Sequence, residues 1–361
     1  MEAYHLLSEE YEASEVYMQS TNVNRTLQSG YSELMGLYPP GKGERLSPEQ
    51  AKAVSTFSAP PFRVRDADKI NHELKDAALP DYYVQIPITQ YNNFDINDDV
   101  STDGCTYINA VGKAIEANAT YWEQFDWMQK QTEKPLEKTL NKTQEEIDNV
   151  GTWHDYQMLT DTVVAMDFEG YHVHEENFSD DQWELLNQYQ HIWLIDDYTK
   201  YANELMMSRM LRKPLDIMKR KVAFMLGKEV EEETNHATED EAKNLKFFIA
   251  SAHDTQVVNM MGFLRKDFDF TPYASTVMFE LKYSEECLAG EDADENCFGV
   301  SVIFNGRKQI FEEFGCTGDF FTIEGCLFPE FLDYMGEIWF SGPQAPDLDA
   351  ACDNPVDPFN E

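Results

Sequence analysis

Two stretches of the chain show the same order of an apolar run, a polar turn and a helical pattern. Glu15–Ser20 predicts a buried strand, and the polar residues after it lead into a helical periodicity that ends at Pro39. Phe247–Ala250 predicts a second strand, and a second helical pattern begins at Thr255. Two units of this kind predict a parallel sheet within an α/β fold.

The remaining pattern divides into a helical middle and a strand-rich end. Strand signals are scarce between Asp103 and Lys228, where helical periodicity predicts a helical insertion followed by a long returning helix. Near the end, three runs predict strands, the first two joined as a hairpin: Ser275–Ser284, Cys297–Asn305 and Arg307–Phe314. Residues 3–13 predict the end of an amphipathic helix, and the acidic residues 229–244 predict a surface loop.

The net charge of the chain limits the kinds of molecule that it is expected to bind. The chain has 67 acidic and 28 basic residues, a net charge of −39. Because nucleic acid and anionic lipid are bound through clustered Lys and Arg, we expect no nucleic-acid partner. A pI near 4.4 fits an acidic compartment, and it fits equally a soluble acidic protein with no such role. No apolar run approaches the roughly 20 residues of a membrane span, so we expect none in this chain.

Cysteines and sequons indicate a secretory route. The six cysteines show no CxxC spacing, which disfavours zinc ligation, and their even number and late clustering fit three disulfides. Asn-x-Ser/Thr sequons begin at Asn24, Asn118, Asn141 and Asn177. The first residues, however, are charged and amphipathic and lack the apolar core of a signal peptide. These two indications conflict.

Three side chains follow the carboxyl ends of the two predicted parallel strands, where α/β proteins bind ligands. Arg25 and His253 could hold an oxyanion between them, and Asp254 could act as a general acid. The simpler alternative is that Asp254 caps the helix and His253 packs in the core.

Two segments resemble the histidine acid phosphatases, the branch of the histidine phosphatases that includes prostatic and lysosomal acid phosphatases. "VYMQSTNVNRTLQSGYSELMGLYPP" is similar to the strand and helix with that family's S-T-x-x-x-R-T motif, and "IASAHDTQV" is similar to its HD motif. Shorter likenesses follow in order along the chain: "IPIT" near residue 86, "GC" at 104–105, "PYAS" at 272–275 and "GC" at 315–316.

The resemblance implies a phosphoglycerate-mutase-like three-layer α/β fold with a helical cap. We expect the α/β domain in residues 1–103 and 186–361, and the cap in residues 104–185. Arg25 and His253 would contact the phosphate, and Asp254 would protonate the leaving group of a small phosphomonoester. The family works through a covalent phosphohistidine, with no metal or other cofactor.

The resemblance also implies two of the disulfides. These are Cys105–Cys352 and Cys316–Cys326, and Cys287–Cys297 is expected from its spacing alone. Because a glycan on Asn24 would block the expected site, the glycosylation candidates are Asn118, Asn141 and Asn177.

One part of the family's pattern is missing. Its nucleophile lies in an R-H-G-x-R-x-P segment on the first strand, and no such segment surrounds any of the eight histidines: His5, His72, His154, His172, His174, His191, His236 and His253. We therefore expect an N-terminally truncated form, inactive by itself, that lacks the nucleophile, the signal peptide and the first central strand. Loss of that strand would leave an exposed edge on Glu15–Ser20.

The sequence thus predicts an acid phosphatase that is secreted or lysosomal, or otherwise vesicular, in its full-length form. The alternative is a non-catalytic pseudophosphatase that binds phosphate or another anion through Arg25 and His253. The sequence leaves a homodimer open. Among substrates, it leaves open protein phosphotyrosine, small metabolites and inositol phosphates, with the net charge of −39 disfavouring the most anionic of them.

Overall fold

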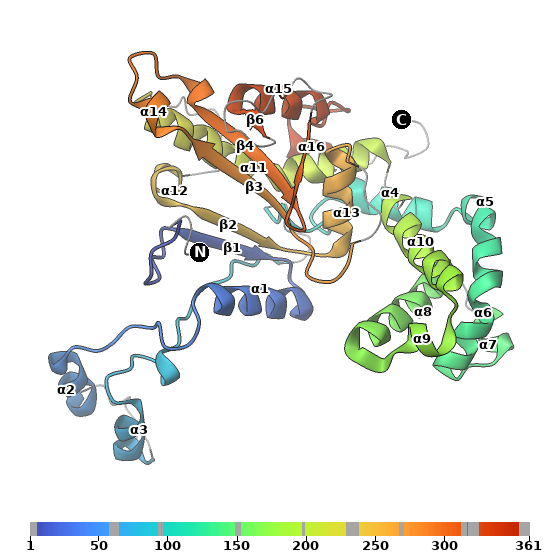
Figure 1. The fold of residues 1–361 in the computed structure, drawn as a ribbon, viewed down its shortest axis with the longest axis horizontal. Helices are drawn as coiled ribbons and strands as arrows, with labels where there is room; N and C mark the ends of the chain where they lie inside the picture. Colours follow the sequence, from blue (N-terminus) through green and yellow to red (C-terminus); the bar gives the residue numbers. More distant parts are fainter. Residues whose placement is uncertain are drawn as a thin grey trace. The chain divides into compact units, whose positions relative to one another are not determined.

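The structure is a computed structural model of a mixed α/β protein (Figure 1). It describes residues 6–57, 65–92, 95, 97–148, 153–196, 199–228, 238–266, 271–311, 316 and 325–353. The chain divides into two compact units. The first unit comprises Met1–Asn93 and Pro214–Ala252, and the second comprises Phe94–Lys213 and His253–Glu361.

The first unit is built on two parallel strands, as the sequence predicts. Strand β1 (Val16–Ser20) pairs with β2 (Phe247–Ser251) in parallel, from Val16 opposite Phe247 to Ser20 opposite Ser251. Helix α1 (Asn24–Leu37) packs on both strands (Figure 1). Gly30 allows this close approach, because a Cβ there would lie 2.5 Å from the Met18 methyl group. The strand–turn–helix order predicted for both stretches is confirmed.

The edge of β1 that faces away from β2 is covered from Met18 to Ser20. The Thr89 N–H donates to the Met18 carbonyl at 2.8 Å, and the Ser20 N–H donates to the Thr89 carbonyl at 3.1 Å. Val16 and Met18 are buried. The expectation of an exposed edge is therefore wrong for the part of this strand from Met18 to Ser20. The extended segment around Thr89, which has no strand pattern of its own, supplies the missing neighbour.

An ion pair between buried Glu15 and exposed Lys246 joins the two segments that lead into the strands. The Glu15 carboxylate lies 2.6 Å from Lys246 Nζ, and it accepts the Ser8 N–H at 2.8 Å and the Ser8 hydroxyl at 2.9 Å. The Glu15 carbonyl also accepts the N–H groups of Lys246 and Phe247. Burial acts to raise the pKa of Glu15, but the hydrogen bonds from Lys246 and Ser8 outweigh it and lower that pKa below its ordinary value.

We expect Glu15→Gln to reduce the free energy of unfolding by about 1–3 kcal/mol at pH 7. The lowered pKa means that the folded state holds the carboxylate charged more strongly than the unfolded chain does. The stabilisation is thus complete above the unfolded pKa, near 4.3, and is lost as the pH falls through the lowered folded pKa. Urea unfolding at pH 7 and pH 3 measures this, with exposed Glu12→Gln as the control. An equal difference at both pH values would contradict the prediction.

Other parts of the first unit correct two predictions. Residues 6–13 are not helical, and the apolar Leu7 and Tyr11 instead pack against the core formed by β1, α1 and β2. The spacing of their apolar residues therefore indicates which side chains are buried, but these residues do not form a helix. Within the predicted loop 229–244, helix α12 (Glu239–Asn244) forms on a capping box, in which Thr238 and Glu241 exchange hydrogen bonds. The remaining helices of this unit are α2 (Pro48–Phe57), α3 (Ala67–Leu74) and η1 (Pro80–Tyr82).

The second unit begins with the helices expected for the cap. These are α4 (Thr106–Glu116), α5 (Ala119–Trp122), η2 (Glu123–Phe125), α6 (Asp126–Leu140), α7 (Gln144–Asp148), α8 (Trp153–Met166), the π-turn η3 (Asp167–Tyr171), α9 (Val173–Asn177) and α10 (Asp180–Asp196). The expected domain boundary after residue 185 falls inside α10, so the bounds of the cap stay a prediction. The long returning helix is α11 (Lys200–Met225), which passes from the second unit into the first.

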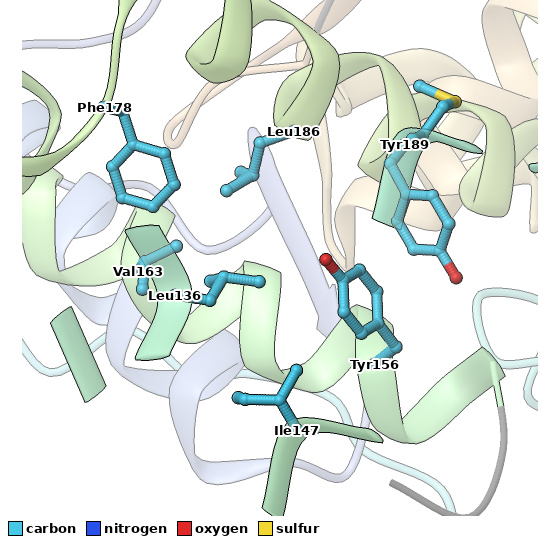
Figure 2. Packing of buried hydrophobic residues seen from close by; sticks show 8 residues of the cluster. Leu136, Ile147, Tyr156, Val163, Phe178, Leu186 and Tyr189 are labelled. Atoms are coloured by element: carbon cyan, nitrogen blue, oxygen red, sulfur yellow. The ribbon is translucent and has the colours of Figure 1, made fainter. Parts of the chain in front are cut away.

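A core of its own stabilises this helical part (Figure 2). Leu136 of α6, Val163 of α8 and Leu186 of α10 are all at most 1% exposed and turn toward one another. The buried Tyr156 hydroxyl lies 2.6 Å from the Thr132 hydroxyl, so its polar end is satisfied. Burial raises the pKa of Tyr156, and it stays uncharged in this core.

The second unit also contains a four-stranded antiparallel sheet. Strand β4 (Phe298–Phe304) pairs with β3 (Val277–Tyr283), β5 (Arg307–Gln309) and β6 (Cys326–Leu327). The predicted hairpin of β3 and β4 is confirmed. Further helical elements of this unit are α13 (Asp254–Phe263), α14 (Glu285–Leu288), η4 (Glu295–Cys297), α15 (Phe328–Ile338) and α16 (Leu348–Asp353).

Three disulfides lie in this unit, and they are the three expected pairs. Cys287–Cys297 closes the β3–β4 connection and Cys316–Cys326 reaches β6. Cys105–Cys352 joins the N-cap of α4 to α16. Disulfides are typical of extracellular and lumenal proteins. None of the helices in the described part of the chain is both long and apolar enough to span a membrane.

Candidate functional site

The carboxyl ends of β1 and β2 lie at the same edge of the parallel pair, where Ser20 is opposite Ser251. In parallel α/β sheets the helices that follow such ends present free N–H groups and a positive dipole end to ligands. Arg25, in the first turn of α1, is exposed after β1. His253 and Asp254 follow β2 at the start of α13.

A buried group of hydroxyls fixes the backbone around Arg25. The Thr26 hydroxyl lies 2.9 Å from the Val23 carbonyl, 3.1 Å from the Thr21 carbonyl and 2.9 Å from the Thr21 hydroxyl. The Ser251 hydroxyl donates to the Thr26 carbonyl at 2.7 Å. The start of α1 is thus bonded to the ends of both strands. Only the pattern of small polar residues after each strand hinted at this network in the sequence.

His253 and Asp254 differ in burial and in role at the start of α13. His253 is the half-buried N-cap residue, and its backbone N–H donates to Gln256 Oε1 at 3.1 Å. Asp254 is exposed, and its Oδ1 accepts the Thr255 N–H at 3.0 Å. The simpler alternative, Asp254 as the helix cap with His253 in the core, is therefore not what the structure has. Asp254 keeps a carboxylate oxygen available to solvent.

Sequence reasoning missed the surroundings of Asp254. Tyr273 precedes β3, and its ring centroid lies 4.5 Å from that of Phe168 in the π-turn. Burial raises the pKa of Tyr273, and the charges of Asp161, Asp254 and Glu169 raise it further. The charge of Asp254 thus acts on one ring of an aromatic pair, and the charges of two more carboxylates act on the same ring. No sequence pattern linked "PYAS" to the residues of α8.

The structure places the three glycosylation candidates in different settings. Asn141 is exposed at the C-terminal end of α6, as a glycan requires. Asn118 is half-buried and caps α5, because its side-chain oxygen accepts the backbone N–H of Tyr121. Asn177 is half-buried at the end of α9. Asn141 has the best exposure of the three.

Other groups in the described residues do not form a rival site. Within the described ranges, no group of three or more His, Cys, Asp or Glu has an arrangement that could hold a metal ion. A pocket beside the Cys105–Cys352 disulfide is lined by Asp103, Asn109, Lys113 and Asp353, and none of the predicted site residues lines it.

Comparison with known proteins finds a matching family and similar solved structures. The chain matches the family described as "Histidine phosphatase superfamily (branch 2)" over residues 1–305. Its structure is similar to that of the phytase from Citrobacter braakii, with a TM-score of 0.52, 14% sequence identity, and coverage of 93% of this chain and 82% of that chain. At that identity the second match shows a shared fold. No curated protein matches the chain significantly.

Proposed function

The chain belongs to the histidine phosphatase superfamily (branch 2), which supports a phosphatase-type hydrolase, and we propose that it is an acid phosphatase acting on phosphomonoesters. One observation carries the proposal beyond the family match. Strands β1 and β2 are parallel neighbours, and the helix after each begins with a residue suited to phosphate chemistry. The carboxyl ends of such strands are the usual ligand site of this fold class.

We assign a role to each of three side chains. Arg25 offers a planar fork of donors to the phosphate oxygens, and His253 donates to the same group. Their charges stabilise the phosphoryl group as the bond from phosphorus to the leaving oxygen breaks. Asp254 donates its proton to that oxygen, so that an alcohol departs instead of an alkoxide. The hydroxyl network of Thr26 and Ser251 holds the backbone of Arg25 in place and thus preorganises it.

The covalent step needs a nucleophilic histidine. In the proposed reaction that histidine attacks phosphorus, and water then hydrolyses the phosphohistidine. The 361 residues contain no Arg-His-Gly segment. We therefore propose turnover for a form of the protein that carries one, and phosphate binding without turnover for these residues alone. The missing segment also favours the second candidate function, a pseudophosphatase that binds anions and catalyses nothing.

Several finer features belong to the same proposal. The three disulfides and the exposed Asn141 support a secreted or lysosomal glycoprotein. The helices from α4 to α9 would form a cap, residues 104–185, that limits which esters reach Asp254. No metal or other cofactor is needed in this scheme, because Arg25, His253 and Asp254 supply the positive charge and the proton.

Phosphate binding tests the proposal directly. We expect calorimetric titration at pH 5.5 to show binding of inorganic phosphate that Arg25→Ala weakens by about 100-fold, the scale expected when a charge-assisted bidentate contact is lost. Arg45→Ala is the matched control, because Arg45 is also an exposed arginine of the first unit but pairs with Asp76. Equal weakening by both variants would point to general loss of positive charge, and unchanged affinity in Arg25→Ala would refute the assignment.

A further inference from the structure

The neighbourhood of Asp254 in the second unit presents aromatic rings to solvent. Phe168 is 65% exposed and Tyr273 is 49% exposed, although their ring centroids are only 4.5 Å apart. Tyr171, at the end of the same π-turn as Phe168, is 66% exposed. Exposed rings that already contact each other offer a surface on which a further ring can pack.

Each of the two rings is carried by a turn with its own hydrogen bonds. Phe168 lies in the π-turn between α8 and α9, where Gly170 has a φ of +86° and the Asp167 carboxylate accepts the His174 N–H at 2.9 Å. On the other side, the Ser275 hydroxyl donates to the Pro272 carbonyl at 2.6 Å, which closes the turn that carries Tyr273.

The β3–β4 hairpin fixes this second turn further. Asn305 Nδ2 donates to the Ser275 hydroxyl at 3.1 Å, and Asn305 Oδ1 accepts the Thr276 N–H at 2.9 Å. Asn305 itself lies in the tight turn after β4. The turn that carries Tyr273 is therefore bonded to the end of the antiparallel sheet, and Phe168 lies in the turn between α8 and α9.

The charges beside these rings are negative. Asp161 of α8, Glu169 of the π-turn and Asp254 each raise the pKa of Tyr273, in addition to the effect of burial. Each charged group with this effect is a carboxylate. A ligand that reaches Asp254 along this side meets aromatic rings and negative charge together.

We propose that Phe168, Glu169, Tyr273 and Asp161, which we call the leaving-group face, bind the alcohol part of the ester and select aromatic alcohols that are neutral or cationic. The inference rests on the proposed function, because a proton donor must lie beside the oxygen that departs and so places the alcohol next to Asp254. Rings favour an aryl group, and carboxylates repel additional phosphates or carboxylates on the substrate. Polyanionic esters such as inositol polyphosphates are then poor substrates.

Phosphonates, which cannot be hydrolysed, test this face without requiring turnover. The probes are benzylphosphonates with a 4-aminomethyl or a 4-carboxymethyl group, and methylphosphonate, which has no ring. We expect the cationic probe to bind about ten-fold more tightly than the anionic one at low salt, from a few exposed charges within several ångströms. Raising the salt to 0.5 M should remove most of this difference, because exposed charges are screened.

Two variants identify the residues responsible. Glu169→Gln should reduce the cation-to-anion ratio by about two- to three-fold, the effect of one exposed charge. Tyr273→Ala should weaken both benzylphosphonates and leave methylphosphonate unchanged. The matched control is Glu175→Gln, because Glu175 is 80% exposed on α9 and lies beside His172.

The outcomes separate this inference from the proposed function. Equal affinity for the two benzylphosphonates, or a ratio that Glu169→Gln and Glu175→Gln change alike, would overturn the leaving-group face while methylphosphonate binding still supports a phosphate site. If none of the three probes binds, both the inference and the proposed phosphate site are refuted.

Discussion

Asp99→Asn should destabilise the second unit by about 3–5 kcal/mol, the cost typical of breaking a buried ion pair. Arg212 donates to both oxygens of Asp99, from Nε at 2.7 Å and from Nη2 at 2.6 Å, and Arg209 Nη2 lies 3.7 Å from the same carboxylate. Arg209 is 1% exposed and Arg212 is 10% exposed. The amide would leave two adjacent guanidinium groups buried without the charge between them.

Urea unfolding, followed by circular dichroism, measures this loss. Asp349→Asn is a graded comparison, because Asp349 accepts one bond from Arg212 at 2.8 Å and is 45% exposed, so we expect about 1 kcal/mol. Glu73→Gln is the control, since the Lys69–Glu73 pair is exposed and is worth less than about 0.5 kcal/mol. If Asp99→Asn costs no more than Glu73→Gln, Asp99 does not hold the α11 arginines.

In a form that carries the proposed nucleophilic histidine, Asp254→Asn should reduce kcat by about 10²- to 10⁴-fold for alkyl phosphates, which have poor leaving groups. For an activated aryl phosphate we expect a loss of about ten-fold or less, because its leaving group departs without a proton. The amide oxygen of asparagine can still accept the Thr255 N–H, so the start of α13 should keep its structure. Single-turnover and steady-state rates on the two classes of ester measure the difference.

The control for this prediction is Asp292→Asn, an exposed residue in the β3–β4 connection. It should leave both rates unchanged. An equal loss for alkyl and aryl esters in Asp254→Asn would show that the residue supports binding or folding and does not supply the proton.

Elements with a strong local pattern could be predicted from the sequence. The apolar run Val16–Ser20 and the periodicity of α1 lie where they were expected, and so does the β3–β4 hairpin. The helix predicted from the amphipathic spacing is wrong for residues 6–13, because Leu7 and Tyr11 pack against the core without forming a helix. A periodic pattern records which residues are buried, and only the surrounding core decides the backbone that buries them.

The candidate site was predictable to a similar extent. Arg25, His253 and Asp254 were identifiable because each follows a predicted strand, and strand ends are positions with a known use in α/β folds. The contact of Tyr273 with Phe168, and the pairing of Asp99 with Arg212, could not be anticipated. In each case the two residues come from distant parts of the chain, and the sequence around neither residue indicates which residue it contacts.

The sequence by itself determined the order of the elements, the family and the three side chains proposed for phosphate chemistry, because these depend on local pattern and on short motifs. The tertiary structure decided that Thr89 covers the Met18–Ser20 part of the edge of β1, that buried hydroxyls fix the start of α1 and that Tyr273, which the charge of Asp254 reaches, contacts Phe168. Hydrogen bonds, burial and electrostatic effects of this kind arise between segments that only the fold brings together, so they have no signature in a linear pattern.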